Sequence, residues 1–348
     1  MKIAFLINDI QTEKDNYTTI RLARRALKDH HQVALVGLSD LIYNTDEKLS
    51  ARASIPAAYD YADDAALLAE LQDDHAETQL CMLSDYDVVL LRADPADELI
   101  TRPWATSSAL LFAQLLVQQG VLVLNDPKEL TDASNKTYFQ TYPAHVRPKT
   151  HISRDVKSIQ KAIDEFEGKA VIKPLQGSGG QGVFIVNEDA AANINQIIEA
   201  TIRDGYAIVQ EYLPKAVNGD LRLITLNGRP LQVEGHYGCI RRYNDTGDGR
   251  SNISAGGKYE IFEPDEDAIK LAYAVGPKLI RDGMYLAGLD IVGDKMMEIN
   301  VDTPGGINMM EELTGADFSG YIINDLVHKI ELNSFYNNRL SIAELALR

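Results

Sequence analysis

The chain has 348 residues, of which 45% are hydrophobic and 24% are charged, as is usual for a folded protein that buries a sizeable core. At this length we expect two or three compact units rather than one. The formal net charge of -17, from 34 Lys and Arg against 51 Asp and Glu, argues against binding to the phosphate backbone of a nucleic acid. An anionic ligand would need a local cluster of cationic side chains and backbone N–H groups.

The N-terminal apolar run, residues 1–7, ends at Asn8 and Asp9 and is too short for a signal peptide. No later run reaches the length of a membrane span. Cys81 and Cys239 lie far apart, which suits a reducing compartment and offers neither a disulfide framework nor a zinc-binding pattern. We therefore expect a cytoplasmic protein that does not associate with a membrane.

The first third of the chain alternates between strand-like and helix-like segments. Strands that alternate with helices indicate an open parallel sheet of the α/β class. The expected elements are a strand at 2–7, a helix at 18–28, strands at 32–38 and 87–91, a helix at 107–119 and a strand at 121–124.

Beyond Asn125-Asp126-Pro127 the alternation gives way to a different pattern, with helices expected at 130–138 and 156–166. From Lys169 onward, strands follow one another and are interrupted by one long helix at 265–282. This pattern predicts an α+β portion after the α/β portion. Its expected strands are 170–173, 183–186, 207–210, 221–226 and 231–235.

The densest signal is the glycine-rich segment from Lys173 to Gly182, which lies between two strand-like runs. It contains the GxGxxG pattern, but a dinucleotide-binding turn leads into a helix, whereas this segment leads into the strand-like Val183–Val186. A Walker A loop is excluded as well, because no Gly-Lys-Ser or Gly-Lys-Thr ends the segment.

A glycine loop between antiparallel strands can close over phosphates and offer them its backbone N–H groups, as the glycine loop of protein kinases does. Lys173, directly before the loop, would add a positive charge. The kinase motifs HRD and DFG are absent from the sequence. The segment therefore predicts a phosphate-binding loop that is not of the kinase type, and the alternative is a hairpin that binds no ligand.

A second signal is a predicted hairpin over residues 286–301 with a three-residue turn at 293–295. In that register Asp290 lies opposite Glu298, and Asn300 shares their face. Opposed carboxylates cost a few tenths to about 1 kcal/mol in exposed pairs, and a cation removes that cost. Oxygen ligands beside a phosphate-binding loop predict a Mg²⁺ site, and the alternative is a solvated acidic face.

Together with the glycine segment and the hairpin, further short motifs form an ordered set that covers all but roughly the last twenty residues. The set consists of Leu91–Pro95, Asn125–Pro127, Asn135-Lys136, the Lys173 glycine segment, Gln210–Pro214, Gly219–Arg222, Asn252–Gly257, Gly288–Asp290 and Glu298–Asn300. No single motif would suffice, but their combined order is specific, and through it the chain resembles the prokaryotic glutathione synthetase family.

The resemblance implies an ATP-grasp fold with ATP and Mg²⁺ as cofactors, and Mn²⁺ as an alternative metal. It places an N-terminal substrate-binding domain at 1–124, a lid subdomain at 125–212 and a C-terminal catalytic subdomain at 213–348. The implied nucleotide ligands are Lys136, Lys173, Gly177, Ser178, Gly179 and Gly180 for the phosphates, Glu211, Tyr212 and Leu213 for the adenine, and Asp220 for the ribose. The implied metal ligands are Asp290, Glu298 and Asn300, in agreement with the hairpin argument.

The same resemblance assigns residues to catalysis and to the other substrates. Arg222, Arg250 and Asn252 would face the transferring phosphate or the amine acceptor. The implied substrate-binding residues are Arg92, Asp94, Arg242, Gly256, Gly257, Pro304, Gly305 and Gly306.

The implied reaction joins γ-glutamylcysteine to glycine. The carboxylate of the dipeptide attacks the γ-phosphate of ATP to give an acyl phosphate, and the amine of glycine displaces phosphate. The products would be glutathione, ADP and phosphate, and closure of the glycine loop would keep water away from the intermediate. The resemblance also implies a homo-oligomer, either a dimer or a tetramer.

One departure from the family concerns the acceptor. After Asn300 the family reads close to Ser-Pro-Thr, whereas residues 301–308 resemble the Pro-Gly turn of ligases that add glutamate to peptides. Gly305 and Gly306 would free backbone N–H groups for a carboxylate, or would simply form a tight turn. An ATP-grasp ligase with another amino acid or peptide acceptor, and a non-catalytic ATP-binding regulatory protein, are the alternative functions.

Overall fold

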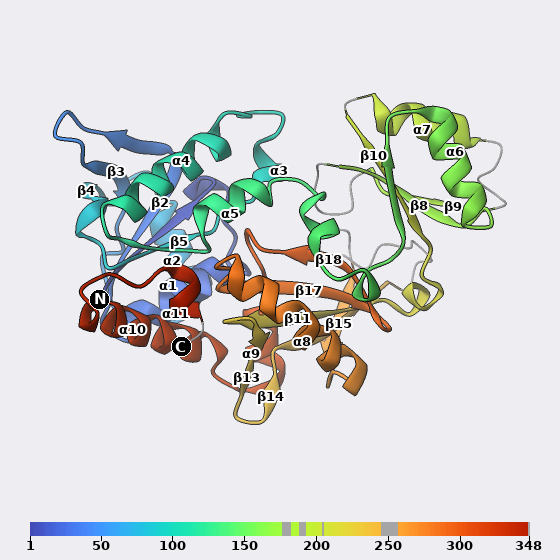
Figure 1. The fold of residues 1–348 in the computed structure, drawn as a ribbon. Helices are drawn as coiled ribbons and strands as arrows, with labels where there is room; N and C mark the ends of the chain where they lie inside the picture. Colours follow the sequence, from blue (N-terminus) through green and yellow to red (C-terminus); the bar gives the residue numbers. More distant parts are fainter. Residues whose placement is uncertain (176–181, 188–192, 204, 245–256, 347–348) are drawn as a thin grey trace.

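The computed structural model describes residues 1–175, 182–187, 193–203, 205–244 and 257–346. Figure 1 shows a large body, made by the N-terminal and C-terminal parts of the chain, and a smaller lobe connected to it. Both chain ends lie on the side of the N-terminal sheet, away from the smaller lobe (Figure 1). Within the described part of the chain, no helix is both long enough and apolar enough to cross a membrane.

The N-terminal sheet has six strands in the order β4-β3-β2-β1-β5-β6. Its four strands β2, β1, β5 and β6 are parallel, and they alternate with helices as the sequence predicts. The strands are β1 (Lys2–Ile7), β2 (Gln32–Tyr43), β3 (Leu49–Ser54), β4 (Thr78–Met82), β5 (Val88–Leu91) and β6 (Leu122–Leu124). The helices are α1 (Thr18–Lys28), α2 (Asp64–Leu71), α3 (Pro95–Glu98) and α4 (Ala105–Gln118).

Two antiparallel strands, β3 and β4, extend this sheet and are absent from the sequence-based prediction. Their sequences, LSARAS and TQLCM, have too few β-branched and aromatic residues to give a strand signal. β4 is also the edge strand, and its first three residues are exposed. β3 is a strand because it pairs with β2 in the folded sheet, and the local sequence pattern alone does not predict this pairing.

The smaller lobe is a four-stranded antiparallel sheet in the order β7-β10-β8-β9, with two helices packed against it (Figure 1). Its core of buried aliphatic side chains includes Ile159, Ile172, Ile198 and Val209. The strands are β7 (Thr150–Ser153), β8 (Ala170–Pro174), β9 (Phe184–Val186) and β10 (Ala207–Glu211), and the helices are α6 (Val156–Glu165) and α7 (Ile194–Ile202).

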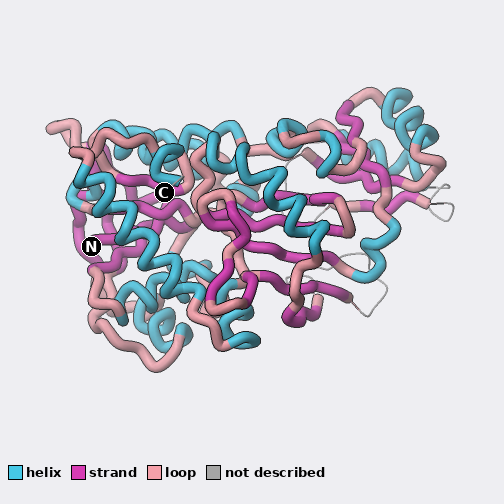
Figure 2. The backbone as a smooth tube through the Cα atoms, turned by 60° about the horizontal axis from the view of Figure 1, so that its bottom comes forward, coloured by secondary structure: helices cyan, strands magenta, loops and turns pink. Residues whose placement is uncertain are grey.

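The C-terminal part has a second large sheet in the order β16-β15-β11-β17-β18, with β12 paired to β11. β13 and β14 form a separate small hairpin, which is labelled at the bottom of Figure 1. Figure 2 shows the strands of the sheets in magenta and the helices in cyan. The strands are β11 (Asp220–Leu226), β12 (Arg229–Pro230), β13 (Gln232–Val233), β14 (His236–Tyr237), β15 (Cys239–Tyr243), β16 (Lys258–Ile261), β17 (Leu286–Val292) and β18 (Lys295–Asn300). Its helices are α8 (Glu266–Arg281), α9 (Ile307–Thr314), α10 (Phe318–Phe335) and α11 (Ile342–Ala346), while α5 (Pro127–Asp132) follows β6 and packs on α4.

The predicted fold class, an α/β sheet followed by an α+β module, is confirmed. The domain boundaries after residues 124 and 212 stay predictions. The large body is held together by a shared core, because apolar side chains of the N-terminal sheet and of the C-terminal sheet belong to the same buried clusters. The two sheets therefore form one framework, on which the residues of the site are placed.

Helix α8 packs closely on this framework at one glycine. A Cβ atom at Gly276 would collide with the carbonyl oxygen of Gly228, in the turn between β11 and β12. Replacing glycine with alanine at an exposed position in a helix normally stabilises the protein by about 1 kcal/mol. At Gly276 we expect the opposite effect on stability, because the added methyl group would collide with the backbone of Gly228.

We predict that Gly276→Ala lowers the free energy of unfolding by about 1–3 kcal/mol, because α8 must move away from the turn. Urea unfolding measures this change. Gly205→Ala is the matched control, since a Cβ atom there meets nothing within 4 Å. A Gly276→Ala protein as stable as its parent would contradict the tight packing of α8.

Candidate functional site

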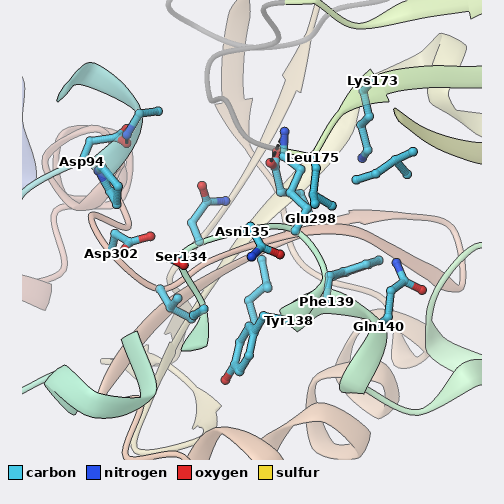
Figure 3. Close-up of a pocket in the computed structure, with 18 of the residues that line it drawn as sticks. Asp94, Ser134, Asn135, Tyr138, Phe139, Gln140, Lys173, Leu175, Glu298 and Asp302 are labelled. Atoms are coloured by element: carbon cyan, nitrogen blue, oxygen red, sulfur yellow. Dashed lines mark hydrogen bonds and ion pairs between the residues drawn. The ribbon is translucent and has the colours of Figure 1, made fainter. Parts of the chain in front are cut away.

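A cavity lies between the large body and the smaller lobe, and it has about 920 Å³ of empty space, part of it open to solvent. Five segments line it: residues 94–99 after β5, residues 133–140 after α5, the end of strand β8 and part of strand β10 in the small lobe, and residues 297–303 at the end of β18. Figure 3 shows Lys173 and Glu298 on one side of the cavity, with Asp94 and Asp302 on the other.

The hairpin of β17 and β18 has the predicted register at its base, with Asp290 opposite Glu298 and Gly288 opposite Asn300. The predicted three-residue turn is wrong. Val292 pairs with Lys295, so the turn has two residues, and the register shifts between Asp290 and Ile291. The reason is Gly293, whose φ of +61° suits the first position of a tight hairpin turn. The bulge compensates for the shorter turn, so Asp290 and Glu298 still lie opposite each other.

Asp290 is buried and is held by two arginines. Its Oδ1 accepts from Arg222 Nε at 2.5 Å, and its Oδ2 accepts from Arg222 Nη2 at 3.0 Å. Arg242 Nη2 lies 2.9 Å from the same Oδ2, and Asn300 Nδ2 donates to it at 3.3 Å. Burial alone would raise the pKa of Asp290, but the two guanidinium groups outweigh it and lower the pKa to about 2. The carboxylate is therefore ionised, as a metal ligand must be.

Glu298 lies among lysines from two other segments. Lys136 Nζ is 3.9 Å from Glu298 Oε1, and Lys173 on β8 also lines the cavity. Burial lowers the pKa of Lys173 to about 8; Lys136 also lowers it, while Glu298 and Asp290 act in the opposite direction. The structure therefore brings together both lysines and both carboxylates that the sequence assigned to phosphates and metal.

The described residues fit a hard cation in the chemistry of their donors. Within the described ranges, His, Cys, Asp and Glu side chains do not gather in groups of three or more, as a metal site made by the protein alone would need. Asp290 and Glu298 nevertheless face each other, and the Asn300 amide is the third oxygen-bearing side chain. Mg²⁺ commonly takes only one or two carboxylates and completes its shell with waters and nucleotide phosphates. This set suits such a shared site better than an all-protein one.

Two of the residues assigned to the adenine and the ribose, Glu211 and Asp220, already bind other groups of the protein through their carboxylates. Glu211 Oε1 accepts from the Lys149 backbone N–H at 2.8 Å, and Leu213 begins the turn after β10. Asp220 is buried and binds the guanidinium of Arg242, with Arg242 Nε donating to Asp220 Oδ1 at 3.1 Å. A ribose contact by Asp220 would have to compete with this ion pair, and that assignment stays a prediction.

The Pro-Gly turn after β18 is fastened to both large sheets. Arg92, at the end of β5, is buried and donates from Nη2 to Pro304 O at 3.0 Å and from Nε to Thr19 Oγ1 at 3.2 Å. Arg222 Nη1 donates to Gly305 O at 3.4 Å. The φ of +114° at Gly306 lies in the left-handed region that favours glycine. Arg92 therefore lies beside the Pro304–Gly306 turn, and the assignment of these residues to substrate binding stays a prediction.

Asp94 lies on the cavity wall and caps α3, where its Oδ1 accepts from Ala96 N at 2.9 Å. Gly257 is the first described residue before β16. Arg250 and Asn252, assigned to catalysis, lie outside the described residues. So do the assigned ligands Gly177, Ser178, Gly179, Gly180 and Gly256.

Sequence reasoning missed several residues of the site. Asp302 and Tyr138 line the cavity, and burial together with the Asp94 carboxylate raises the pKa of Asp302 to about 7. Its position two residues after Asn300 was a usable signal, since alternate residues leave a strand on the same face. Tyr138 follows Lys136 by two residues but has no comparable sequence signal.

Glu13 is a second missed carboxylate, buried near Arg92. Among the residues that the structure describes, its Oε2 finds no hydrogen-bond partner. Burial raises the pKa of Glu13 to about 7, although Arg92 lowers it and Asp97 raises it. The Glu13 carboxyl is therefore an ionisable group that the folded state keeps protonated to a higher pH than the unfolded chain does.

The fold is that of ATP-grasp ligases. The chain superimposes on D-cycloserine synthetase DcsG with a TM-score of 0.63 and 14% sequence identity, covering 94% of this chain and 99% of that one. An ATP-grasp RimK domain protein from Sphaerobacter thermophilus gives a TM-score of 0.56 and 18% identity, over 93% and 98% of the two chains. The chain therefore has the fold of ATP-grasp proteins.

Two family descriptions match almost the whole chain: "Prokaryotic glutathione synthetase, N-terminal domain" over residues 1–131 and "Prokaryotic glutathione synthetase, ATP-grasp domain" over residues 135–315. Glutathione synthetase of Vibrio parahaemolyticus is 33% identical over 257 residues, which are 73% of this chain and 77% of that protein. Glutathione synthetase of Synechococcus elongatus is 29% identical over 327 residues, or 93% and 97%. The chain belongs to the prokaryotic glutathione synthetase family.

It follows that the chain is an ATP-dependent carbon–nitrogen ligase that acts on small molecules. The expected use of ATP and the expected family are confirmed. The family supports an enzyme over a non-catalytic ATP-binding protein.

We predict that Glu13→Gln changes the dependence of stability on pH. The pKa of Glu13 rises from 4.5 to about 7 on folding, so the folded state binds more protons than the unfolded state between these values. The free energy of unfolding of the parent must therefore fall as pH rises through this window, and this contribution is absent from the variant.

The free energy of unfolding of the variant minus that of its parent should therefore be larger at about pH 8 than at about pH 5. Urea unfolding at both pH values measures the difference, and Asp302, which is present in both proteins, cancels from it. Glu165→Gln removes an exposed carboxylate and serves as the control. Parallel pH profiles for Glu13→Gln and the parent would contradict the buried state of Glu13.

Proposed function

We propose that the chain joins the cysteinyl carboxylate of γ-glutamylcysteine to the amine of glycine, with ATP converted to ADP and phosphate. The observation that carries this proposal is the convergence of Lys136, Lys173 and Glu298 in one cavity, with Asp290 directly across the hairpin from Glu298. The family of the chain supports the choice of substrates.

The reaction proceeds in two steps that need no covalent enzyme intermediate. An oxygen of the donor carboxylate attacks the γ-phosphorus of ATP, the bond to the bridging oxygen breaks, and ADP leaves. The amine nitrogen then attacks the acyl carbon, the C–O bond breaks, and the phosphate leaves with that carboxylate oxygen while the amine loses a proton. Lys136 and Lys173 place positive charge where the transferring group carries negative charge, which lowers the barrier of the first step.

Asp290, Glu298 and Asn300 would hold Mg²⁺, or Mn²⁺, together with the nucleotide. The cation would neutralise phosphate charge and bridge the nucleotide to the hairpin. Arg222 and Arg242 keep Asp290 ionised at any pH at which the enzyme works, because they lower its pKa to about 2. Binding the cation would require Asp290 to share its oxygens with these arginines.

We predict that Glu298→Gln reduces kcat by at least about a hundredfold while the fold stays intact, because the amide keeps the shape of the side chain and loses the charge. Steady-state kinetics across a range of Mg²⁺ concentrations measures this, and circular dichroism checks the fold. Near-normal turnover at saturating Mg²⁺ would eliminate Glu298 as a metal ligand.

The donor and the acceptor would occupy the part of the cavity near Asp94 and Asp302. Arg222 would connect the metal-binding part of the site with the acceptor part, since it binds both the Asp290 carboxylate and the Gly305 carbonyl. Arg250 and Asn252 would join it at the transferring phosphate, and Gly256 and Gly257 would border the acceptor. Catalysis in the cytoplasm by a homo-oligomer, a dimer or a tetramer, belongs to the same proposal.

An acceptor other than glycine is the second candidate, and the Gly305–Gly306 turn favours it. Gly305 lies two residues beyond Thr303, which lines the cavity, and the space where its Cβ atom would lie is open, which would favour a larger amino acid nearby. Under this alternative, glutamate or a peptide replaces glycine and the ATP chemistry is unchanged.

We predict that ADP release requires γ-glutamylcysteine and glycine together. A pocket that fits glycine excludes a side chain sterically, so alanine should be a poor acceptor and glutamate a poorer one. A coupled ADP assay with each amino acid, followed by mass spectrometry of the products, measures the preference. Faster turnover with glutamate than with glycine, or ADP release that does not depend on the dipeptide, would overturn the glutathione assignment and leave the ligase class intact.

A further inference from the structure

The segment that carries Lys136 is attached to the small lobe. The Lys136 backbone N–H donates to Leu175 O at 3.1 Å, and Leu175 lies two residues beyond Lys173 at the end of β8. The Lys136 ammonium reaches Glu298 from the same segment. The two lysines of the site thus share one backbone connection, and that connection by itself would let both move with the small lobe.

Two residues further on, the same segment is attached to the large body. Tyr138 O–H donates to Asp282 Oδ2 at 2.7 Å, and Asp282 follows α8 as its C-cap. The Tyr138 ring lines the cavity, while its hydroxyl points away from Glu298 (Figure 3). Tyr138 and Asp282 are 6% and 5% exposed, so their hydrogen bond is shielded from water.

A small network surrounds this hydrogen bond. Lys278, one turn before Asp282 on α8, forms an ion pair with the same Oδ2, and its ammonium lies 4.6 Å from the centre of the Tyr138 ring. Tyr142 O–H donates to the Tyr138 hydroxyl oxygen at 3.1 Å. Burial raises the pKa of Tyr138, and Tyr142 and Asp282 raise it further, so the hydroxyl stays a donor. A buried donor to a charged acceptor is among the stronger hydrogen bonds in proteins.

Asp282 is connected directly to the strand that carries Asp290. Gly283 follows it and accepts a hydrogen bond from the Asp126 backbone N–H at 3.1 Å, and β17 begins three residues later, at Leu286. The Asn125 side chain donates to Leu286 O at 2.9 Å and accepts from Leu286 N at 2.9 Å. Segment 125–138 is therefore tied at one end to Leu286, the first residue of β17, and at the other end to Asp282, four residues before it.

We propose that Tyr138 is a positioning residue, which through Asp282 fixes Lys136 relative to the β17–β18 hairpin and so sets the geometry of the nucleotide phosphates. The proposal rests on the proposed function, because it assigns Lys136 to the phosphates. It assigns a function to the Tyr138 hydroxyl, which binds Asp282 on the side of the ring away from the substrates. The competing possibility is that the network only stabilises the contact of α8 with residues 138–142.

The test measures ATP binding by titration calorimetry, with Mg²⁺ present and without donor or amine. Tyr138→Phe keeps the ring and removes the hydroxyl, while Lys278 continues to neutralise Asp282. We expect ATP affinity to fall about five- to tenfold, because Lys136 loses its fixed position. In kinetics, the KM for ATP should rise by a similar factor, and the KM values for the donor and the amine should stay within about twofold.

Double variants with Lys136→Met separate positioning from general loosening. If Tyr138 acts through Lys136, Tyr138→Phe adds no further loss of ATP affinity in the Lys136→Met background. Tyr61→Phe is the matched control, because Tyr61 O–H donates to the Glu70 carboxylate at 2.8 Å in the N-terminal domain. This control should lower the melting temperature without changing ATP affinity.

Three results would overturn the positioning role. They are an unchanged ATP affinity in Tyr138→Phe, a Tyr138→Phe effect that is undiminished in the Lys136→Met background, and equal rises in KM for all substrates. The failure of the proposed function looks different. Lys136→Met alone would then bind ATP as the parent does, or the parent would bind ATP and release no ADP with γ-glutamylcysteine and glycine.

Discussion

The site depends on one buried arrangement of charges on three neighbouring strands. Asp220 and Arg222 are alternate residues of β11, and the register places Arg222 beside Asp290 on β17 and Asp220 beside Arg242 on β15. Two carboxylates and two guanidinium groups thus neutralise one another inside the C-terminal sheet. Removal of any one of them would leave a buried charge without its partner, which typically costs about 3–5 kcal/mol.

This arrangement determines what the hairpin can do. With its pKa lowered to about 2, Asp290 remains an anion across the hairpin from Glu298, which lines the cavity. Lys136 and Lys173 reach the same point from other segments, so the site combines two anions and two cations that come from three parts of the chain. A nucleotide with its cation could engage both kinds of charge at once. The same geometry would bind ATP poorly if the small lobe and the hairpin were misaligned, so their alignment is a structural requirement of the reaction.

The sequence predicted the parts of the site that are local. The Asp290–Glu298 register follows from strand alternation within one hairpin, and Lys173 follows from its place before a glycine segment. The parallel strands β1, β2, β5 and β6 were likewise predictable from their hydrophobic runs. The turn length was wrong because a bulge at Asp290/Ile291 compensates for a shorter turn, and alternation alone cannot detect a bulge.

The parts that the sequence could not predict involve partners that lie far apart along the chain. Arg222 and Asp290 are 68 residues apart, and Tyr138 and Asp282 are 144 residues apart. Asp220 was assigned to a ribose on the strength of the family pattern, yet in the fold it binds Arg242. A buried polar group takes whichever partner the packing provides, and only the tertiary structure identifies that partner.

The proposed acyl phosphate is tested most directly by following one oxygen atom. With γ-glutamylcysteine labelled with ¹⁸O in its cysteinyl carboxylate, transfer of the γ-phosphoryl group to that carboxylate and later displacement by glycine must move one labelled oxygen into inorganic phosphate. Mass spectrometry of the phosphate should find one ¹⁸O for each peptide bond formed, with the other label retained in the product. Phosphate free of label, in a reaction that still forms the peptide bond and ADP, would contradict the acyl phosphate and the role given to the cavity.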